Sequence, residues 1–127
     1  MILGIGTDIV NVARMEAALQ RHGEKFARRL LTILEWDEYQ QSAHPGRFLA
    51  KRFAAKEALA KACSTGLRHP VGLQSINITH DALGKPAFDF DAGLADFLRV
   101  RGVVRNHLSI SDEHEMALAF VILEGDA

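Results

Sequence analysis

The stretch RFLAKRFAAKEALAKACSTG, residues 47–66, predicts one long helix around which the rest of the chain is organised. Nearly every residue in it is a good helix former, and no glycine or proline interrupts it before Gly66. Pro45 and Gly46 precede the stretch, and Gly66 stands where a glycine in the left-handed conformation would cap the helix end. Apolar side chains recur at the helical period, which predicts one buried face: Leu49, Phe53, Ala60 and Cys63.

Glu57 is the only acidic residue in this stretch, among five basic ones. Glu57 and Lys61 are one helical turn apart and share a face with Phe53, which indicates at least partial burial. A carboxylate and an ammonium group beside a buried face need partners. The spacing leaves open whether those partners are other side chains or a metal ion and a phosphate.

Outward from this helix, hydrophobic periodicity and turn residues predict an α+β fold. Residues 1–8 are typical of a short strand interrupted by two glycines, and residues 116–123 are typical of a central, strongly apolar strand. The other predicted elements are a helix that Asn11 caps and Gly23 ends, a helix at 24–31, a helix to Ser42 opened by a capping box of Thr32 and Glu35, strands at 75–80 and 87–90, a helix at 94–101 and a strand at 107–111. This order predicts an antiparallel sheet packed on the long helix, in a single domain spanning residues 1–127.

Composition predicts an ordinary globular protein. The chain has 127 residues, of which 48% are hydrophobic and 24% charged, and its single cysteine, Cys63, can form no internal disulfide. The amino terminus lacks the pattern of a signal peptide, and no stretch approaches the ~20 apolar residues of a membrane helix. A lone cysteine also fits a reducing compartment, so we expect a cytoplasmic protein.

Charge is unevenly distributed, although the net charge is only -1. Residues 14–29 hold five basic and two acidic side chains, whereas residues 81–127 hold nine acidic and four basic ones. Basic helices suit an acidic protein, a nucleic acid or an anionic small molecule as partner. Two ordinary solvated helix faces are an equally weighted alternative.

Asp8 and Glu57 are the candidate pair for chemistry. Oxygen ligands select magnesium, calcium or manganese, and magnesium usually takes only one or two carboxylates together with water and substrate phosphates. Without further information we favour the simpler alternative, in which Asp8 caps a turn and Glu57 pairs with Lys61 on an exposed helix. The chain has no Walker phosphate loop, no CxxC motif and no zinc-type histidine spacing.

Four short motifs nevertheless resemble one family along nearly the whole chain. GTDIV at residues 6–10, followed by Arg14, and FLAKRFAAKEA at residues 48–58, followed by Lys61, are similar to the motifs of the holo-acyl-carrier-protein synthases. LGKP at residues 83–86 and HLSIS at residues 107–111 fit the same family in the same order.

This resemblance implies a 4'-phosphopantetheinyl transferase-like fold and a magnesium-dependent enzyme of fatty acid biosynthesis. The enzyme would transfer the 4'-phosphopantetheine arm of coenzyme A to a serine of apo acyl carrier protein and release adenosine 3',5'-bisphosphate. It would work as a homotrimer with sites at subunit interfaces, and neither a nucleic acid nor a membrane is implied as partner. The roles implied for single residues are metal binding by Asp8 and Glu57, pyrophosphate contact and catalysis by Lys61, nucleotide contact by Lys85 and His107, and contact with the acidic carrier by Arg14, Arg21, Lys25 and Arg28.

Three positions depart from the family pattern. Asn11 stands where relatives often have an acid, Ser64 where many have glycine, and Asp112 where many have histidine. These departures concern loop contacts rather than the pair of Asp8 and Glu57. The alternatives to the transferase are a magnesium-dependent phosphohydrolase using the same carboxylates and a non-enzymatic binder of an acidic protein.

Overall fold

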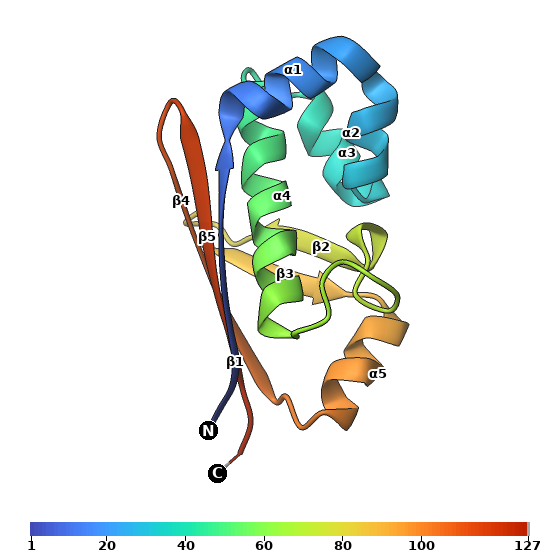
Figure 1. Ribbon diagram of the computed structural model, residues 1–127, viewed down its shortest axis with the longest axis vertical. Coiled ribbons are helices and arrows are strands. Elements are labelled where there is room, and N and C mark those ends of the chain that lie inside the picture. Colours follow the sequence, from blue (N-terminus) through green and yellow to red (C-terminus); the bar gives the residue numbers. More distant parts are fainter. Residues whose placement is uncertain (127) are drawn as a thin grey trace.

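The computed structural model describes residues 1–126 and has the predicted α+β architecture. Its elements are β1 (Ile2–Asn11), α1 (Val12–His22), α2 (Glu24–Leu30), α3 (Ile33–Gln40), α4 (Pro45–Ala62), the 3-10 helix η1 (Leu73–Ser75), β2 (Ile76–His80), β3 (Pro86–Phe90), α5 (Ala92–Val100), β4 (Arg105–Asp112) and β5 (Met116–Glu124). The strands form two antiparallel sheets, one in the order β1-β5-β4 and one of β2 and β3. Figure 1 shows α4 in the middle, with the larger sheet along one side and α1 to α3 at one end. The prediction that residues 116–123 form a central strand is therefore confirmed for β5.

The two glycines of β1 allow this strand to lie directly on α4. A Cβ atom at Gly4 would lie 2.0 Å from the carbonyl oxygen of Ala62, and one at Gly6 would lie 1.9 Å from that of Ala58. Side chains alternate between the two faces of a strand, so Asp8, two residues after Gly6, also faces α4. β1 extends to Asn11 instead of ending at Asp8, because Asn11 still pairs with Met116 of β5. Asp8 is thus held inside a paired strand rather than at a loose strand end.

The end of α4 differs from the prediction. The helix ends at Ala62, and Ser64, not Gly66, takes the left-handed capping position with φ 60°. The amide of Ser64 donates to the Lys61 carbonyl at 3.0 Å, and the amide of Thr65 donates to the Ala60 carbonyl at 3.2 Å. These two bonds form the Schellman arrangement that satisfies the last carbonyls of a helix. Gly66 also has a positive φ, 67°, but it lies beyond this cap.

We expect Ser64→Gly to stabilise the protein by about 1 kcal/mol, because a left-handed conformation is strained for every residue except glycine. The melting temperature should rise by about 3–5 °C for a domain of this size. Thermal unfolding of the parent and the variant measures the effect. A Ser42→Gly variant, changed at a serine outside the left-handed region, serves as control and should gain nothing. A fall in melting temperature for Ser64→Gly would show that its side chain is needed.

The predicted helix caps near the amino terminus are confirmed. The Asn11 side chain accepts a hydrogen bond from the Ala13 amide and opens α1, while Gly23 follows the last residue of that helix. Thr32 and Glu35 form a reciprocal capping box at the start of α3. None of the helices within residues 1–126 is long and apolar enough to cross a membrane.

A buried ion cluster joins α3, α4 and β2, and the sequence did not reveal it. Lys56 and Glu35 are both fully buried, and the Lys56 ammonium donates to Glu35 Oε1 at 2.7 Å and to the carbonyls of Leu30 and Leu73. The other oxygen of Glu35 accepts from the Ile78 amide at 3.0 Å. Burial lowers the pKa of Lys56, whereas the Glu35 carboxylate opposes that shift. Lys56 precedes Glu57 in α4, so these contacts with Leu30, Glu35 and Leu73 also fix the part of the helix that carries Glu57.

Candidate active site

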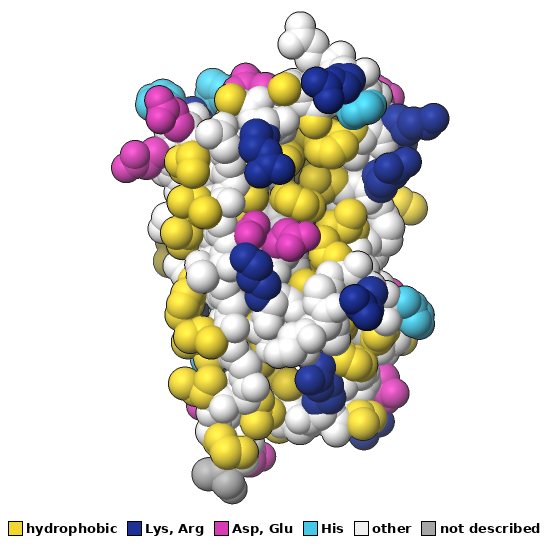
Figure 2. Space-filling view, in the orientation of Figure 1, with side chains coloured by type: hydrophobic (Ala, Val, Ile, Leu, Met, Phe, Trp, Pro, Cys, Tyr) yellow, Lys and Arg dark blue, Asp and Glu magenta, His cyan; other side chains and the backbone are white. Residues whose placement is uncertain are grey.

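The structure brings Asp8, Glu57 and Lys61 together where β1 lies on α4. The Lys61 ammonium donates to Asp8 Oδ1 at 3.0 Å and to the Thr7 carbonyl at 3.0 Å. The Asp8 side chain is 16% exposed and that of Lys61 is 53% exposed, so the group sits at the surface with its carboxylates partly shielded. Figure 2 shows neighbouring acidic side chains over the region of β1 and α4, beside a basic side chain and apolar surface.

Glu57 is held in a setting that disfavours its charge. Burial raises its pKa above the ordinary value of 4.5, the nearby Asp8 carboxylate raises it further, and Lys61 only partly offsets these effects. Within residues 1–126, no hydrogen bond or ion pair involves the Glu57 carboxylate, and no group of three potential metal-binding side chains forms. Two adjacent carboxylates without a third protein ligand fit magnesium, which takes its other ligands from water and phosphates.

Lys85 and His107 lie elsewhere in the same chain. His107 is opposite Ile122, and Asp8 is opposite Ala119, which is buried under α4. Residues paired across two strands point to the same face of a sheet, and successive residues along a strand alternate between the two faces. Ala119 and Ile122 are three positions apart on β5, so their partners Asp8 and His107 project from opposite faces of the sheet. His107 Nε2 contacts Glu124 Oε1 at 2.9 Å. Lys85 lies in the turn between β2 and β3, and β3 of this hairpin packs against β4.

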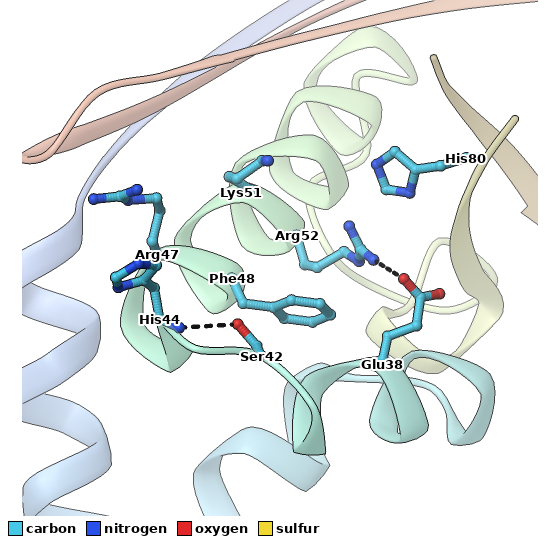
Figure 3. Close-up of a pocket in the computed structure, with 8 residues that line it drawn as sticks. All are labelled: Glu38, Ser42, His44, Arg47, Phe48, Lys51, Arg52 and His80. Carbon is cyan, nitrogen blue, oxygen red and sulfur yellow. Dashed lines mark hydrogen bonds and ion pairs between the residues drawn. The ribbon is translucent and has the colours of Figure 1, made fainter. Parts of the chain in front are cut away.

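A basic pocket of about 370 Å³ lies on the same side of the molecule as that turn. Its lining comes from α3, α4, the loop before α4 and the end of β2: Glu38, Ser42, His44, Arg47, Phe48, Lys51, Arg52 and His80. Figure 3 shows the Arg52 guanidinium between the Phe48 ring and the Glu38 carboxylate. Burial and the Arg52 charge lower the pKa of His80 below its ordinary value of 6.5.

Sequence reasoning did not assign this pocket. The excess of basic residues at 47–61 was a signal for it, but the position of His80 beside Arg52 depends on how β2 packs. Asp112, one of the departures from the family pattern, contacts Lys51 across 3.6 Å, and His114 Nδ1 lies 3.1 Å from Arg47 Nη2. The hairpin between β4 and β5 therefore contacts the basic face of α4.

The four basic residues predicted to face a carrier protein are all exposed on α1 and α2. Within residues 1–126, Arg14, Arg21 and Lys25 form no ion pair, whereas Arg28 lies 3.7 Å from Glu24 and stacks over Trp36 at 4.1 Å. Three of the four cations are thus available to an external partner, and Arg28 is already engaged with its own chain.

The face of the larger sheet that turns away from α4 is apolar and exposed. Its large side chains have exposed fractions from 37% to 58%: Leu3, Ile5, Ile9, Leu118 and Phe120. The opposite face of the central strand consists of buried small and aliphatic side chains under α4. An apolar strip of this kind is typical of a protein–protein interface.

Comparison with known proteins identifies the class. A family model of the 4'-phosphopantetheinyl transferase superfamily matches residues 4–119. The chain therefore belongs to the 4'-phosphopantetheinyl transferase superfamily. This result confirms the resemblance and the transferase class that the motifs around Asp8 and Glu57 predicted.

The relatives within the superfamily are holo-[acyl-carrier-protein] synthases. The synthase of Nitrosospira multiformis is 60% identical over 124 residues, which cover 98% of this chain and 99% of that protein. The crystal structure of the Neisseria meningitidis synthase has a TM-score of 0.94 and 49% identity, covering 98% of this chain and 99% of that one. The synthase of Bacillus anthracis, solved in complex with CoA (3',5'-ADP), has a TM-score of 0.83 and 36% identity, with 99% of each chain covered. The predicted fold is confirmed by these structures.

Proposed function

We propose that this chain transfers phosphopantetheine from coenzyme A to apo acyl carrier protein at the group of Asp8, Glu57 and Lys61, with magnesium as cofactor. The observation that carries the proposal is the geometry of this group: the Asp8 carboxylate lies close enough to raise the pKa of Glu57, and Lys61 contacts Asp8 at the surface. Such an enzyme acts in fatty acid biosynthesis. We infer a cytoplasmic location from the lone cysteine.

Asp8 and Glu57 would hold the magnesium ion, which when bound neutralises charge on the transferring phosphoryl group and on its leaving group. The Lys61 ammonium has three N–H donors, of which Asp8 and the Thr7 carbonyl take two. The third remains for an oxygen of the coenzyme A pyrophosphate, so Lys61 stabilises the leaving adenosine bisphosphate. A base near the carboxylates accepts the proton of the carrier serine.

The basic pocket suits the nucleotide end of coenzyme A, which is its most anionic part. Arg47, Lys51 and Arg52 supply fixed positive charge there, and phosphates bind well to such clusters. Lys85 lies in the turn that follows His80, a lining residue of the pocket, whereas His107 lies on the sheet face that turns away from α4. Because His107 and Asp8 project from opposite faces of the sheet, we infer that a coenzyme A molecule that contacts both spans two chains.

A homotrimer with sites at its subunit interfaces meets this requirement. The exposed apolar face of the β1-β5-β4 sheet, with Ile5, Ile9 and Phe120, supports association of the chain with copies of itself. His107 lies on this same face, so a neighbouring subunit would contribute it to the site at the interface.

We expect the double variant Arg14→Glu with Arg21→Glu to raise the KM for carrier protein about tenfold, with little change in the KM for coenzyme A. The two arginines are two helical turns apart on α1 and steer an acidic partner toward Asp8. High salt should raise the carrier KM of the parent in the same way, because it screens the same attraction. Steady-state kinetics against salt concentration measures both effects.

The control is Arg99→Glu, a charge reversal on α5 at an exposed residue. It should leave the carrier KM unchanged. A double variant on α1 that loses melting temperature while its carrier KM and salt response stay like the parent would mean that these arginines serve stability alone.

One assay tests the proposed reaction against its alternatives. The protein is incubated with coenzyme A and apo acyl carrier protein, with magnesium or with a chelator, and the carrier is weighed. We expect the carrier to gain one phosphopantetheine group only when magnesium is present. Free phosphate without a carrier adduct would indicate a phosphohydrolase, and no reaction at all would indicate a binding protein.

A further inference from the structure

Among residues 1–126, Glu38 is the only acidic residue that lines the basic pocket. The other ionisable residues of the lining are bases: His44, Arg47, Lys51, Arg52 and His80. A carboxylate in this position repels any phosphate that enters the pocket. Its Oε2 accepts a hydrogen bond from Arg52 Nη2 at 3.0 Å, as the dashed line in Figure 3 shows.

Arg52 has contacts besides Glu38 that orient it. Its side chain is only 3% exposed, its Nε lies 3.6 Å from Glu35 Oε2, and its guanidinium stacks on Phe48 at 4.3 Å. Glu35 is itself fixed by Lys56 and by backbone amides in the buried cluster. Glu38 is 54% exposed, so its half-solvated carboxylate adds little further restraint. Glu38 therefore occupies the Nη2 donor of Arg52, while Glu35 and Phe48 also contact the same guanidinium.

We propose that Glu38 competes with the phosphate of the substrate for Arg52 and so limits how tightly the pocket holds the nucleotide end of coenzyme A. This rests on the proposed binding of that end in the pocket. An entering phosphate displaces the carboxylate from Arg52 Nη2, and the exposed Glu38 side chain turns toward solvent. The bisphosphate product leaves the same pocket, so a competing carboxylate also speeds its release.

The test is the dissociation constant of adenosine 3',5'-bisphosphate, measured by calorimetry on the parent and on variants of the full chain. Glu38→Gln should bind the bisphosphate about three- to tenfold more tightly, because it removes one opposing charge and replaces a carboxylate with an amide that competes less well for the Arg52 donor. The gain should shrink at high salt. The control is Asp37→Asn, which removes the same charge from the next position of α3, outside this pocket, and should bind like the parent.

Lys51→Gln separates the two ways in which the proposal can fail. Lys51 lines the pocket and is 33% exposed, so its loss should weaken bisphosphate binding without unfolding the protein. If Lys51→Gln binds like the parent, the pocket is not the nucleotide site, and the assignment of that end of coenzyme A fails. If Lys51→Gln weakens binding while Glu38→Gln binds no more tightly than the parent, only the competition by Glu38 is overturned.

Discussion

The Glu57→Gln variant should lose about three orders of magnitude in kcat/KM for phosphopantetheine transfer, equivalent to about 4 kcal/mol of transition-state stabilisation. The change keeps the size of the side chain but removes the charge that a magnesium ion requires. Asp8→Asn should have a similar effect, and the double variant should be little worse than either single one, because the two carboxylates act as one unit. Initial rates across a magnesium titration measure these losses.

Stability should change in the opposite direction to activity. The pKa of Glu57 is raised in the folded protein, so the folded state binds its proton more tightly than the unfolded chain does. Folding stability then falls as pH rises from the ordinary carboxyl range through the folded pKa, and ionised Glu57 weakens the fold at neutral pH. Without metal, Glu57→Gln should therefore melt no lower than the parent.

Asp96→Asn is the control, because it removes one acidic charge at an exposed position of α5. It should keep parental turnover and magnesium dependence. Parental turnover of Glu57→Gln or Asp8→Asn at ordinary magnesium concentrations would contradict the metal assignment.

Lys56→Met should lower the free energy of unfolding by about 3–5 kcal/mol, a large part of the stability of a domain of this size. The substitution leaves the Glu35 carboxylate fully buried without its ammonium partner, although Arg52 and two backbone amides still face it. The carbonyls of Leu30 and Leu73 also lose a donor. Denaturant unfolding of the parent and the variant gives the difference.

Replacing both Lys56 and Glu35 distinguishes the cost of an unpaired buried charge from the cost of lost packing. Lys56→Met with Glu35→Leu should cost less than the sum of the two single changes, because no unpaired charge is left. Lys51→Met, at a partly exposed position of the same helix, should cost about 1 kcal/mol or less. An effect of Lys56→Met no larger than that of Lys51→Met would show that the buried pair contributes nothing to the fold.

Local sequence patterns predicted much of this fold, because helix caps and apolar strands depend on residues that are close together in the sequence. The Asn11 cap, the capping box of Thr32 and Glu35 and the central place of β5 follow from neighbouring residues and from apolar runs. The approach of Asp8 to Glu57 was predicted through the family resemblance, and Gly4 and Gly6 supply its physical reason.

The remaining features depend on tertiary contacts that no local pattern encodes. Glu35 was predicted only as a cap residue, yet it is also the buried partner of Lys56, which lies 21 positions away. Ser64 adopts a conformation that glycine usually occupies, so the helix end was placed too late. Alternation predicted that His107 lies on the polar side of its strand, but only the register of the sheet shows that this side faces away from Asp8.

We propose that a working site combines Asp8 and Glu57 of one chain with His107 of another. Neither Glu57→Gln nor His107→Ala chains should transfer phosphopantetheine well alone. Co-expressed with distinguishable tags and purified through both tags, they should regain activity, since about one third of the interfaces in trimers that contain both variants would pair two intact halves. Activity that stays at the level of the separate variants in such mixed assemblies, or full activity of a parental monomer, would contradict the shared site.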